Sequence, residues 1–263
     1  MMDVHPYLSR EYPLRLAHRG SRVLWPENTL AAFQGAVDLG YRYIETDVQL
    51  TKDGTVVVFH DDDLDRLTNG TGPIRGWEWE DVRHLDAAWA FSESNGYPLR
   101  STGCAIPTLE EVLTAFPQVS FNIDLKCRGA EWAVADVVMR LGRTDSVLIA
   151  GISDARTARF RRITRGRVAT SAGRRAIATM WAASRIGRSL ERPEVAYQVP
   201  FDYTPRLDAK FVDAVHGAGA QVHAWTVNQK GDMEELLDLG VDGIVTDRPD
   251  LLNEVLQDRG VDA

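Results

Sequence analysis

Cysteine is scarce in this chain, because only Cys104 and Cys127 occur among its 263 residues. Two cysteines are too few for a disulfide framework, and they lack the spacing of paired metal ligands. We therefore expect both to be free thiols. Glycine-rich phosphate loops are also missing, since neither GxGxxG nor GxxxxGK followed by Ser or Thr occurs. Their absence argues against a doubly wound nucleotide-binding sheet.

Long apolar runs are missing too. No stretch approaches the roughly 18 apolar residues that a membrane-spanning helix requires. The first residues, MMDVHPYLSREYPLRL, hold no apolar core of the kind found in secretory signal peptides. We therefore expect a cytoplasmic protein. The rest of the composition is ordinary for a globular domain, with 44% hydrophobic and 26% charged residues.

Basic residues are outnumbered by acidic ones, which gives the chain a net charge of −8. This balance argues against a nucleic-acid partner, because the phosphate backbone selects basic surfaces. The charge is uneven, however. The segment from Arg156 to Arg192 contains eleven arginines and one acid, Glu191. Solvated helix faces are the simplest explanation of this segment.

Contact with an anionic membrane is the alternative explanation of the Arg156–Arg192 segment. Residues 174–190, RRAIATMWAASRIGRSL, combine arginines with Met180, Trp181 and Ile186. An interfacial helix pairs an apolar face with basic residues that bind lipid headgroups. We therefore keep peripheral membrane binding through this segment as a hypothesis.

Predicted strands and helices alternate along most of the chain. Eight strands begin near residues 14, 43, 120, 146, 168, 196, 221 and 243, and a helix is expected after each. Residues 55–60 form an extra antiparallel strand. Eight such units in about 250 residues predict a (β/α)8 barrel, or TIM barrel. No linker, repeat or low-complexity tract is visible, so residues 1–263 are expected to form one domain.

Two local features modify this plan. Residues 64–105 are rich in glycine, tryptophan and polar residues, and we expect them to form an insertion within the barrel domain. One short helix is expected there, near Glu78–Leu85. Its tryptophans are more readily explained by packing than by a pocket mouth. Earlier in the chain, Asn28 is expected to cap the helix that follows it.

The stretch from Tyr43 to Asp62, YIETDVQLTKDGTVVVFHDD, contains the first group of candidate functional residues. Glu45 and Asp47 point to the same face of a strand, about 7 Å apart. The Asp-Gly pair that follows is typical of a tight reversal. If the hairpin pivots near Asp53, His60 returns beside both acids. Two carboxylates and an imidazole then converge on one point.

The carboxyl ends of the other predicted strands supply further candidates, because TIM-barrel active sites lie at that face. The first strand ends in His18 and Arg19, the third carries Asp124 and Lys126, and the seventh carries Trp225. The candidate site therefore holds three acids, two histidines, two basic residues and an apolar wall (Glu45, Asp47, Asp124; His18, His60; Arg19, Lys126; Trp225).

This set of side chains favours phosphoester cleavage. Three carboxylates close together repel one another unless a cation joins them, and oxygen ligands suit Mg²⁺ or Ca²⁺. Histidines exchange protons near neutral pH. Arg19 and Lys126 suit an anionic oxygen such as that of a phosphate. Phosphoester cleavage uses a hard cation, two acid/base groups and fixed positive charges.

Simpler structural explanations exist for several of these residues. A lone histidine is usually structural, and Lys126 could form an ordinary salt bridge with Asp124. His223 lies near Trp225, but nothing else points to it, so we interpret it as a residue that fills the barrel. The joint presence of His18 and His60 beside three strand-borne acids favours the functional interpretation.

Several motifs resemble the glycerophosphodiester phosphodiesterase family, within the superfamily of phospholipase C-like phosphodiesterases. The resemblance runs in order from Leu14 to about Leu256. Its motifs are His18-Arg19-Gly20, Pro26-Glu27-Asn28-Thr29, Glu45-Thr46-Asp47-Val48, Thr51-Lys52-Asp53-Gly54, His60-Asp61, Asp124-Leu125-Lys126, Trp225-Thr226-Val227-Asn228 and Thr246-Asp247-Arg248-Pro249.

The resemblance implies a TIM-barrel phosphodiesterase that requires one divalent cation. It implies that His18 and His60 are the acid/base pair and that Arg19 and Lys126 bind the phosphate. The metal ligands would be Glu45, Asp47 and Asp124. The insertion at residues 64–105 lies where the family carries its own, which shapes access for the glycerol moiety.

One position departs from the family pattern, because many members have glutamate where this chain has Asp124. Aspartate is one methylene shorter, so the ion either lies closer to this strand or is reached through a water. Aspartate followed by a lysine two residues later also resembles the phospholipase D-type toxins of the same superfamily. The departure bears more on the substrate than on the reaction.

Three functions are compatible with these residues. The leading hypothesis is a metal-dependent hydrolase that cleaves glycerophosphodiesters, such as glycerophosphocholine or glycerophosphoethanolamine, to sn-glycerol 3-phosphate and an alcohol. The second is a lysophospholipase D, suggested by the arginine-rich segment. The third is a non-catalytic binding protein on the same barrel. That protein would be expected to lack one of the histidines or acids, and all are present.

Overall fold

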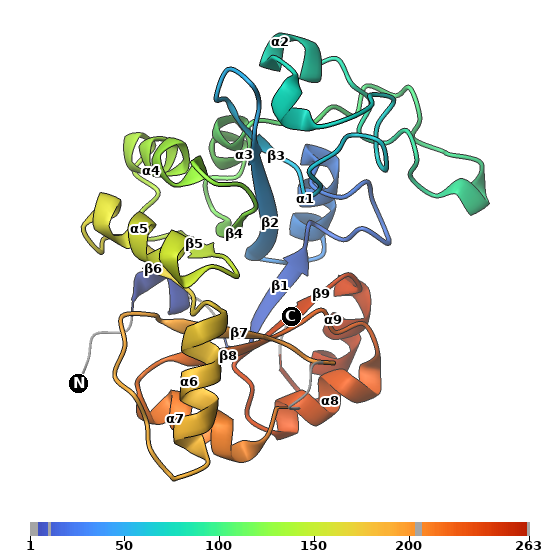
Figure 1. Cartoon of the computed structure of the whole chain (residues 1–263). Helices are drawn as coiled ribbons and strands as arrows, with labels where there is room; N and C mark the ends of the chain where they lie inside the picture. Colours follow the sequence, from blue (N-terminus) through green and yellow to red (C-terminus); the bar gives the residue numbers. More distant parts are fainter. Residues whose placement is uncertain (1–4, 10–11, 203–206, 262–263) are drawn as a thin grey trace.

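Eight parallel strands form a barrel at the centre of the structure (Figure 1). The computed structural model describes residues 5–9, 12–202 and 207–261. Neighbouring strands follow the order β6-β5-β4-β2-β1-β9-β8-β7, and a bridge between Ser171 and Ala196 brings β6 beside β7. The predicted TIM barrel is therefore confirmed. Its strands are β1 (Leu14–His18), β2 (Tyr43–Leu50), β4 (Ser120–Leu125), β5 (Val147–Ala150), β6 (Ala169–Thr170), β7 (Ala196–Pro200), β8 (Gln221–Trp225) and β9 (Gly243–Thr246).

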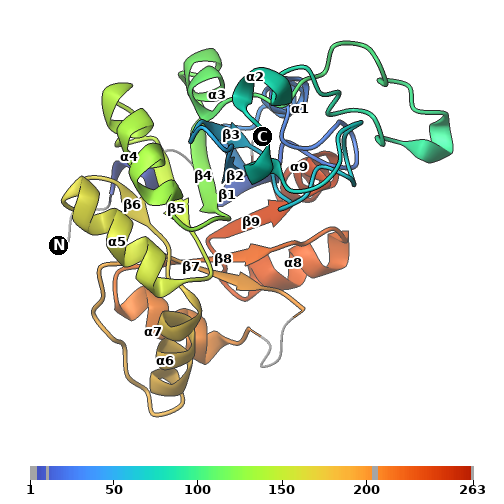
Figure 2. The same ribbon diagram turned by 45° about the horizontal axis from the view of Figure 1, so that its top comes forward.

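Helices surround the strands, as Figure 2 shows. A 3-10 helix, η1 (Pro6–Leu8), packs Tyr7 against Tyr43 with ring centroids 5.2 Å apart. Apolar side chains on the outer strand faces pack against the helices, and Phe33 and Phe121 form one such contact. The surrounding helices are α1 (Leu30–Asp38), α3 (Leu109–Ala115), α4 (Ala130–Arg140), α5 (Asp154–Thr164), α6 (Arg174–Ser184), α7 (Ala209–Gly217), α8 (Lys230–Asp238) and α9 (Pro249–Asp258).

The hairpin after β2 has the predicted register. Strand β3 (Val56–Val58) pairs antiparallel with β2, and Val48 faces Val58 while Leu50 faces Val56. The backbone N–H of Phe59 donates to the carbonyl oxygen of Asp47 at 3.0 Å. This register runs the chain back from Leu50 to the level of Asp47, and His60 follows directly. The position predicted for His60 is therefore confirmed.

The cap predicted for α1 is wrong by one residue. Thr29 caps the helix, because its hydroxyl accepts a hydrogen bond from the backbone N–H of Ala32. Asn28 instead has a left-handed backbone, with φ of 59°, and its side chain donates to Asp47 at 2.9 Å. Both residue types are good caps, so local preference did not separate them.

The stretch from Leu64 to Ala105 lies between β3 and α3 and has a small apolar core of its own. It contains η2 (Ile74–Gly76), α2 (Trp79–Val82) and η3 (Glu93–Asn95). Leu64, Ile74 and Val82 are buried with Phe59, and Trp77 and Trp79 pack against this cluster. The packing role predicted for the tryptophans is confirmed for these two. Trp89 remains 38% exposed.

The apolar face expected on residues 174–190 is formed only in part. Met180 is fully buried, whereas Ile186 is 71% exposed. Trp181 is partly buried beneath Arg185, whose guanidinium carbon lies 4.5 Å from the ring centroid. Within the described residues, no helix is long and apolar enough to cross a membrane. Cys104 and Cys127 are free, as expected.

His223 fills the barrel interior, as the sequence predicted. It is fully buried, with Nδ1 3.3 Å from Gln198 Nε2 and Nε2 3.1 Å from Gln221 Oε1. Gly243 faces it across the sheet, and a Cβ there would lie 2.8 Å from the ring. Burial lowers the pKa of His223 to about 4. The native barrel therefore holds a neutral ring.

Acidification is expected to destabilise the protein through His223. The unfolded chain takes up a proton near pH 6.5, and the native ring does so only near pH 4. Stability is therefore lost as the pH falls between these values, by up to about 1.4 kcal/mol per pH unit. Urea unfolding should show this slope in the wild type and a shallower one in His223→Gln. If the free energy of unfolding depends on pH equally in the two proteins, the prediction is contradicted.

Candidate active site

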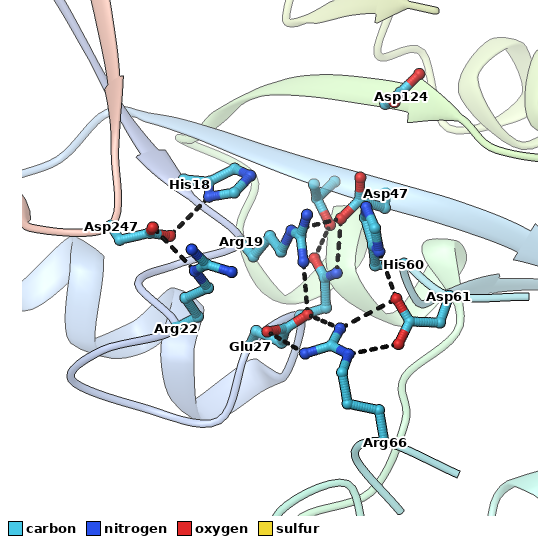
Figure 3. A network of polar contacts seen from close by, with 12 residues as sticks. His18, Arg19, Arg22, Glu27, Asp47, His60, Asp61, Arg66, Asp124 and Asp247 are labelled. Carbon is cyan, nitrogen blue, oxygen red and sulfur yellow. Dashed lines mark hydrogen bonds and ion pairs between the residues drawn. The ribbon is translucent and has the colours of Figure 1, made fainter. Parts of the chain in front are cut away.

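The predicted histidines and acids lie beside three neighbouring strands, β1, β2 and β4, and Figure 3 shows His18, His60, Asp47 and Asp124. His18 on β1 is the register partner of Glu45 on β2, and Asp47 on β2 is the partner of Asp124 on β4. Side chains two residues apart on β2 point to the same face, which is the barrel interior. The sheet therefore brings together residues from distant parts of the sequence.

His18 is held by a buried carboxylate that the sequence analysis did not assign. Its Nδ1 lies 2.6 Å from Oδ1 of Asp247, which follows β9. Asp247 also accepts hydrogen bonds from Arg22 and Asn228, each at 2.9 Å. Burial alone would raise the pKa of Asp247, but His18 and the other donors lower it to about 2. A charged Asp247 favours a proton on Nδ1 of His18, which leaves Nε2 for chemistry.

His60 has the same arrangement with a different carboxylate. Its Nδ1 lies 2.6 Å from Oδ1 of Asp61, and its side chain is 31% exposed. Burial lowers the pKa of His60, and the negative charge of Asp47 opposes this shift. The Thr-Asp-Arg and His-Asp motifs were visible in the sequence, but they did not reveal that each histidine has its own carboxylate partner.

The three acids predicted as metal ligands are bridged in part by a lysine. Nζ of Lys126 lies 2.9 Å from Oδ1 of Asp47 and 2.6 Å from Oδ2 of Asp124. Burial alone would raise the pKa of Asp47, but Lys126 and Arg19 hold it well below the usual value. The salt bridge considered for Lys126 and Asp124 is therefore present, and it extends to Asp47.

Glu45 is the acid without such compensation. Its Oε2 is buried and has no hydrogen-bond partner among the described residues, and Nε2 of His18 lies 3.7 Å away. Burial, followed by the charge of Asp47, raises the pKa of Glu45 to about 7. A buried carboxylate oxygen without a partner is costly, and a bound cation would satisfy it. The unpartnered oxygen of Glu45 is therefore one feature that the predicted divalent ion would satisfy.

The three acids do not form a finished metal site in this structure. Across residues 5–9, 12–202 and 207–261, no group of three or more His, Cys, Asp or Glu side chains has an arrangement that could hold a metal. The ammonium group of Lys126 binds two of the three predicted ligands. The metal remains a prediction, supported by the orphaned oxygen of Glu45.

Arg19 is anchored by two acids beside this cluster. Its Nε lies 3.0 Å from Oδ2 of Asp47, and its Nη1 donates to Oε1 of Glu27 at 2.7 Å. Asn28 orients Asp47 through the hydrogen bond described above and accepts one from Thr46 at 2.8 Å. Arg19 therefore has a fixed position, as a phosphate-binding residue requires.

Trp225 ends β8, two strands from β1 in the barrel, and is 36% exposed. It lies at the same end of the barrel as His18 and can form part of an apolar wall there. Its predicted contact with substrate stays a prediction.

Comparison with known proteins gives one consistent result. Residues 18–251 match the Glycerophosphoryl diester phosphodiesterase family. "Probable glycerophosphodiester phosphodiesterase 2" of Mycobacterium tuberculosis is 38% identical and covers 94% of this chain and 92% of its own length. A glycerophosphodiester phosphodiesterase of Caldanaerobacter subterraneus is 32% identical, with coverage of 94% and 99%.

Solved structures show the same fold. A phosphodiesterase of Oleispira antarctica, in complex with the product sn-glycerol-3-phosphate, is 25% identical with a TM-score of 0.76, and the match covers 94% of this chain and 97% of that one. A glycerophosphoryl diester phosphodiesterase domain from M. tuberculosis is 23% identical with a TM-score of 0.81, covering 94% and 100%.

Loss of the Glu27 charge is expected to destabilise the fold. The Glu27 side chain is only 4% exposed and binds both Arg19 and Arg66. Glu27→Gln should lower the free energy of unfolding by about 3 kcal/mol, since it breaks a buried ion pair. The control is Glu110→Gln, because Glu110 binds Arg140 through two hydrogen bonds but is 49% exposed.

The control should lose much less of the unfolding free energy, because exposed ion pairs contribute little to stability. Urea unfolding of the two variants and the wild type measures both effects. Equal losses in the two variants would show that burial does not set the contribution of Glu27.

Proposed function

The chain belongs to the glycerophosphoryl diester phosphodiesterase family, and we propose that it hydrolyses glycerophosphodiesters to sn-glycerol 3-phosphate and an alcohol. Glycerophosphocholine and glycerophosphoethanolamine are the proposed substrates. One observation carries this proposal. Two histidines, each with Nδ1 held by a carboxylate, lie beside two basic side chains at the mouth of one barrel.

The histidines provide the proton transfers that phosphodiester cleavage requires. Asp247 holds His18 and Asp61 holds His60, so the Nε2 atom of each ring is left to exchange a proton with the substrate. One ring removes the proton of the attacking hydroxyl or water, and the other gives a proton to the leaving alcohol. Both rings have the same kind of carboxylate partner, so their contacts fit either assignment.

The basic residues bind the phosphate in this proposal. Arg19 and Lys126 lie on opposite sides of Asp47, and both keep their positive charges in the folded protein. Fixed positive charges stabilise the negative charge that develops on phosphoryl oxygens during cleavage. Glu45, Asp47 and Asp124 would hold one Mg²⁺ or Ca²⁺. When bound, that ion polarises the phosphate and adds to this stabilisation.

The lysophospholipase D alternative has lost one of its supports, because Met180 is buried instead of forming an apolar membrane-facing surface. Five of the arginines also have partners within the fold. Arg161 and Arg192 bind the buried Glu194, Arg185 binds Asp208, Arg159 lies near Glu131, and Arg156 donates to the carbonyl of Leu125. Deacylated phosphodiesters are therefore favoured over lysophospholipids.

Both histidines are expected to be required for activity. His18→Ala and His60→Ala should each lower kcat on glycerophosphocholine by about 10²- to 10⁴-fold, the usual contribution of a general acid or base. Release of sn-glycerol 3-phosphate measures the rate. The matched control is His84→Ala, because the His84 side chain is 73% exposed in the insertion.

The control should retain wild-type activity. The same variants and the wild type are also assayed for hydrolysis of lysophosphatidylcholine. Sedimentation with anionic liposomes tests membrane binding. Faster cleavage of the acylated substrate would favour the lysophospholipase D function instead. Full activity of either active-site variant would overturn the acid/base assignment.

Divalent cations are expected to bind at Glu45. Mg²⁺ or Ca²⁺ should raise the thermal unfolding midpoint of the EDTA-treated wild type by a few degrees, because a ligand of the native state stabilises it. Glu45→Gln should abolish that shift, whereas the exposed Glu110→Gln should preserve it. EDTA should also remove the hydrolytic activity of the wild type. A shift that persists in Glu45→Gln would place the cation elsewhere.

A further inference from the structure

Arg66 lies in the insertion, outside the motifs that resemble the family, and yet its guanidinium contacts two site carboxylates (Figure 3). Its Nη2 donates to Oε1 of Glu27 at 2.8 Å and to Oδ1 of Asp61 at 3.1 Å. Its Nη1 donates to the second oxygen of Glu27, and its Nε donates to the second oxygen of Asp61. One planar group therefore binds both acids through all four oxygens.

The same two acids hold residues that were assigned to the chemistry. Oε1 of Glu27 accepts from Arg19 at 2.7 Å, and Oδ1 of Asp61 lies 2.6 Å from Nδ1 of His60. A single nitrogen of Arg66 contacts each of these shared oxygens. The contacts therefore run without interruption from Arg19 through Glu27, Arg66 and Asp61 to His60.

We propose that Arg66 is a positioning residue that fixes the His60 ring relative to the Arg19 guanidinium. His60 follows the β2–β3 hairpin, and Arg19 lies in the loop after β1, so β2 joins their backbones. Arg66 adds a link between their side chains. A guanidinium suits this task because it stays charged and its donors lie in one plane. Efficient proton transfer requires that the ring be aligned with the bound phosphate.

Anchoring the insertion is the competing role for Arg66, and other contacts already provide it. Leu64 is fully buried with Phe59 and Ile74 in the core of the insertion. The backbone N–H of Leu64 donates to Gly72, and that of Ile74 donates to Asp62. The Arg66 side chain is 45% exposed and adds nothing to that apolar core. Its contacts point instead to the site.

This inference rests on the proposed hydrolysis, and the wild type is the reference in every assay. Arg66→Met should lower kcat on glycerophosphocholine by about 10- to 100-fold, the usual effect of removing a residue that orients a functional group. KM should change less than kcat. Arg66→Lys should recover only part of the loss, because an ammonium cannot reproduce the fork.

The matched control is Arg83→Lys. Arg83 lies in the same insertion, is half exposed and contacts a surface acid, Glu80, at 3.4 Å. It should keep wild-type kcat. Thermal unfolding of each variant establishes that it is folded, and Arg66→Lys carries the test if Arg66→Met is not.

A pair of double-mutant cycles separates positioning of His60 by Arg66 from a non-specific effect of Arg66 on the whole site. Asp61→Asn breaks the path from Arg66 to His60, whereas Asp247→Asn affects the other histidine. If Arg66 acts through Asp61, Arg66→Met should lower kcat by less than about 3-fold in the Asp61→Asn background. In the Asp247→Asn background it should lower kcat by the full factor of about 10- to 100-fold.

The outcomes distinguish failure of the proposed function from failure of the positioning role. A wild-type enzyme that cleaves no glycerophosphodiester overturns the proposed function. An active wild type with a full Arg66→Met loss in both backgrounds, or with no loss at all, overturns only the positioning role.

Discussion

The balance of charge at the barrel mouth governs this site. Glu45, Asp47 and Asp124 project from neighbouring strands, and such close acids repel one another strongly in a buried position. Lys126 joins two of them, and Arg19 neutralises Asp47 from the other side. One oxygen of Glu45 remains uncompensated. That unpartnered oxygen is the observation behind the proposed cation, and the paired acids fix Lys126 and Arg19 in place.

The fold was predictable because its signals are local and repeated. Alternating strands and helices identified the barrel, and the Asp-Gly turn placed His60 in the observed register. The failures were also local. Asn28 and Thr29 are both good caps, so the sequence did not show that Asn28 turns toward Asp47. Met180 was expected on an apolar surface, but an amphipathic pattern does not tell whether a helix buries its apolar residues against the protein or a membrane.

The site was predictable in part. Strand ends in a TIM barrel identify the residues that face the mouth, which gave both histidines, the acids and the bases. Their partners were less visible. His18 and Asp247 are 229 residues apart, so no spacing reveals their hydrogen bond. Arg66 stood in a stretch interpreted as an insertion, and only the folded structure shows it between Glu27 and Asp61.

The barrel closes by very few hydrogen bonds at one place. Strand β6 has two residues, and its junction with β7 depends on the bonds from Ala172 to Ala196 and from Val195 to Thr170. His18, Glu45, Asp47 and Asp124 lie on strands β1, β2 and β4, whose pairings with one another are longer. The junction with the fewest hydrogen bonds therefore lies away from the strands that carry the reacting groups. The β6–β7 junction and the strands that carry the site residues therefore lie on different sides of the same sheet.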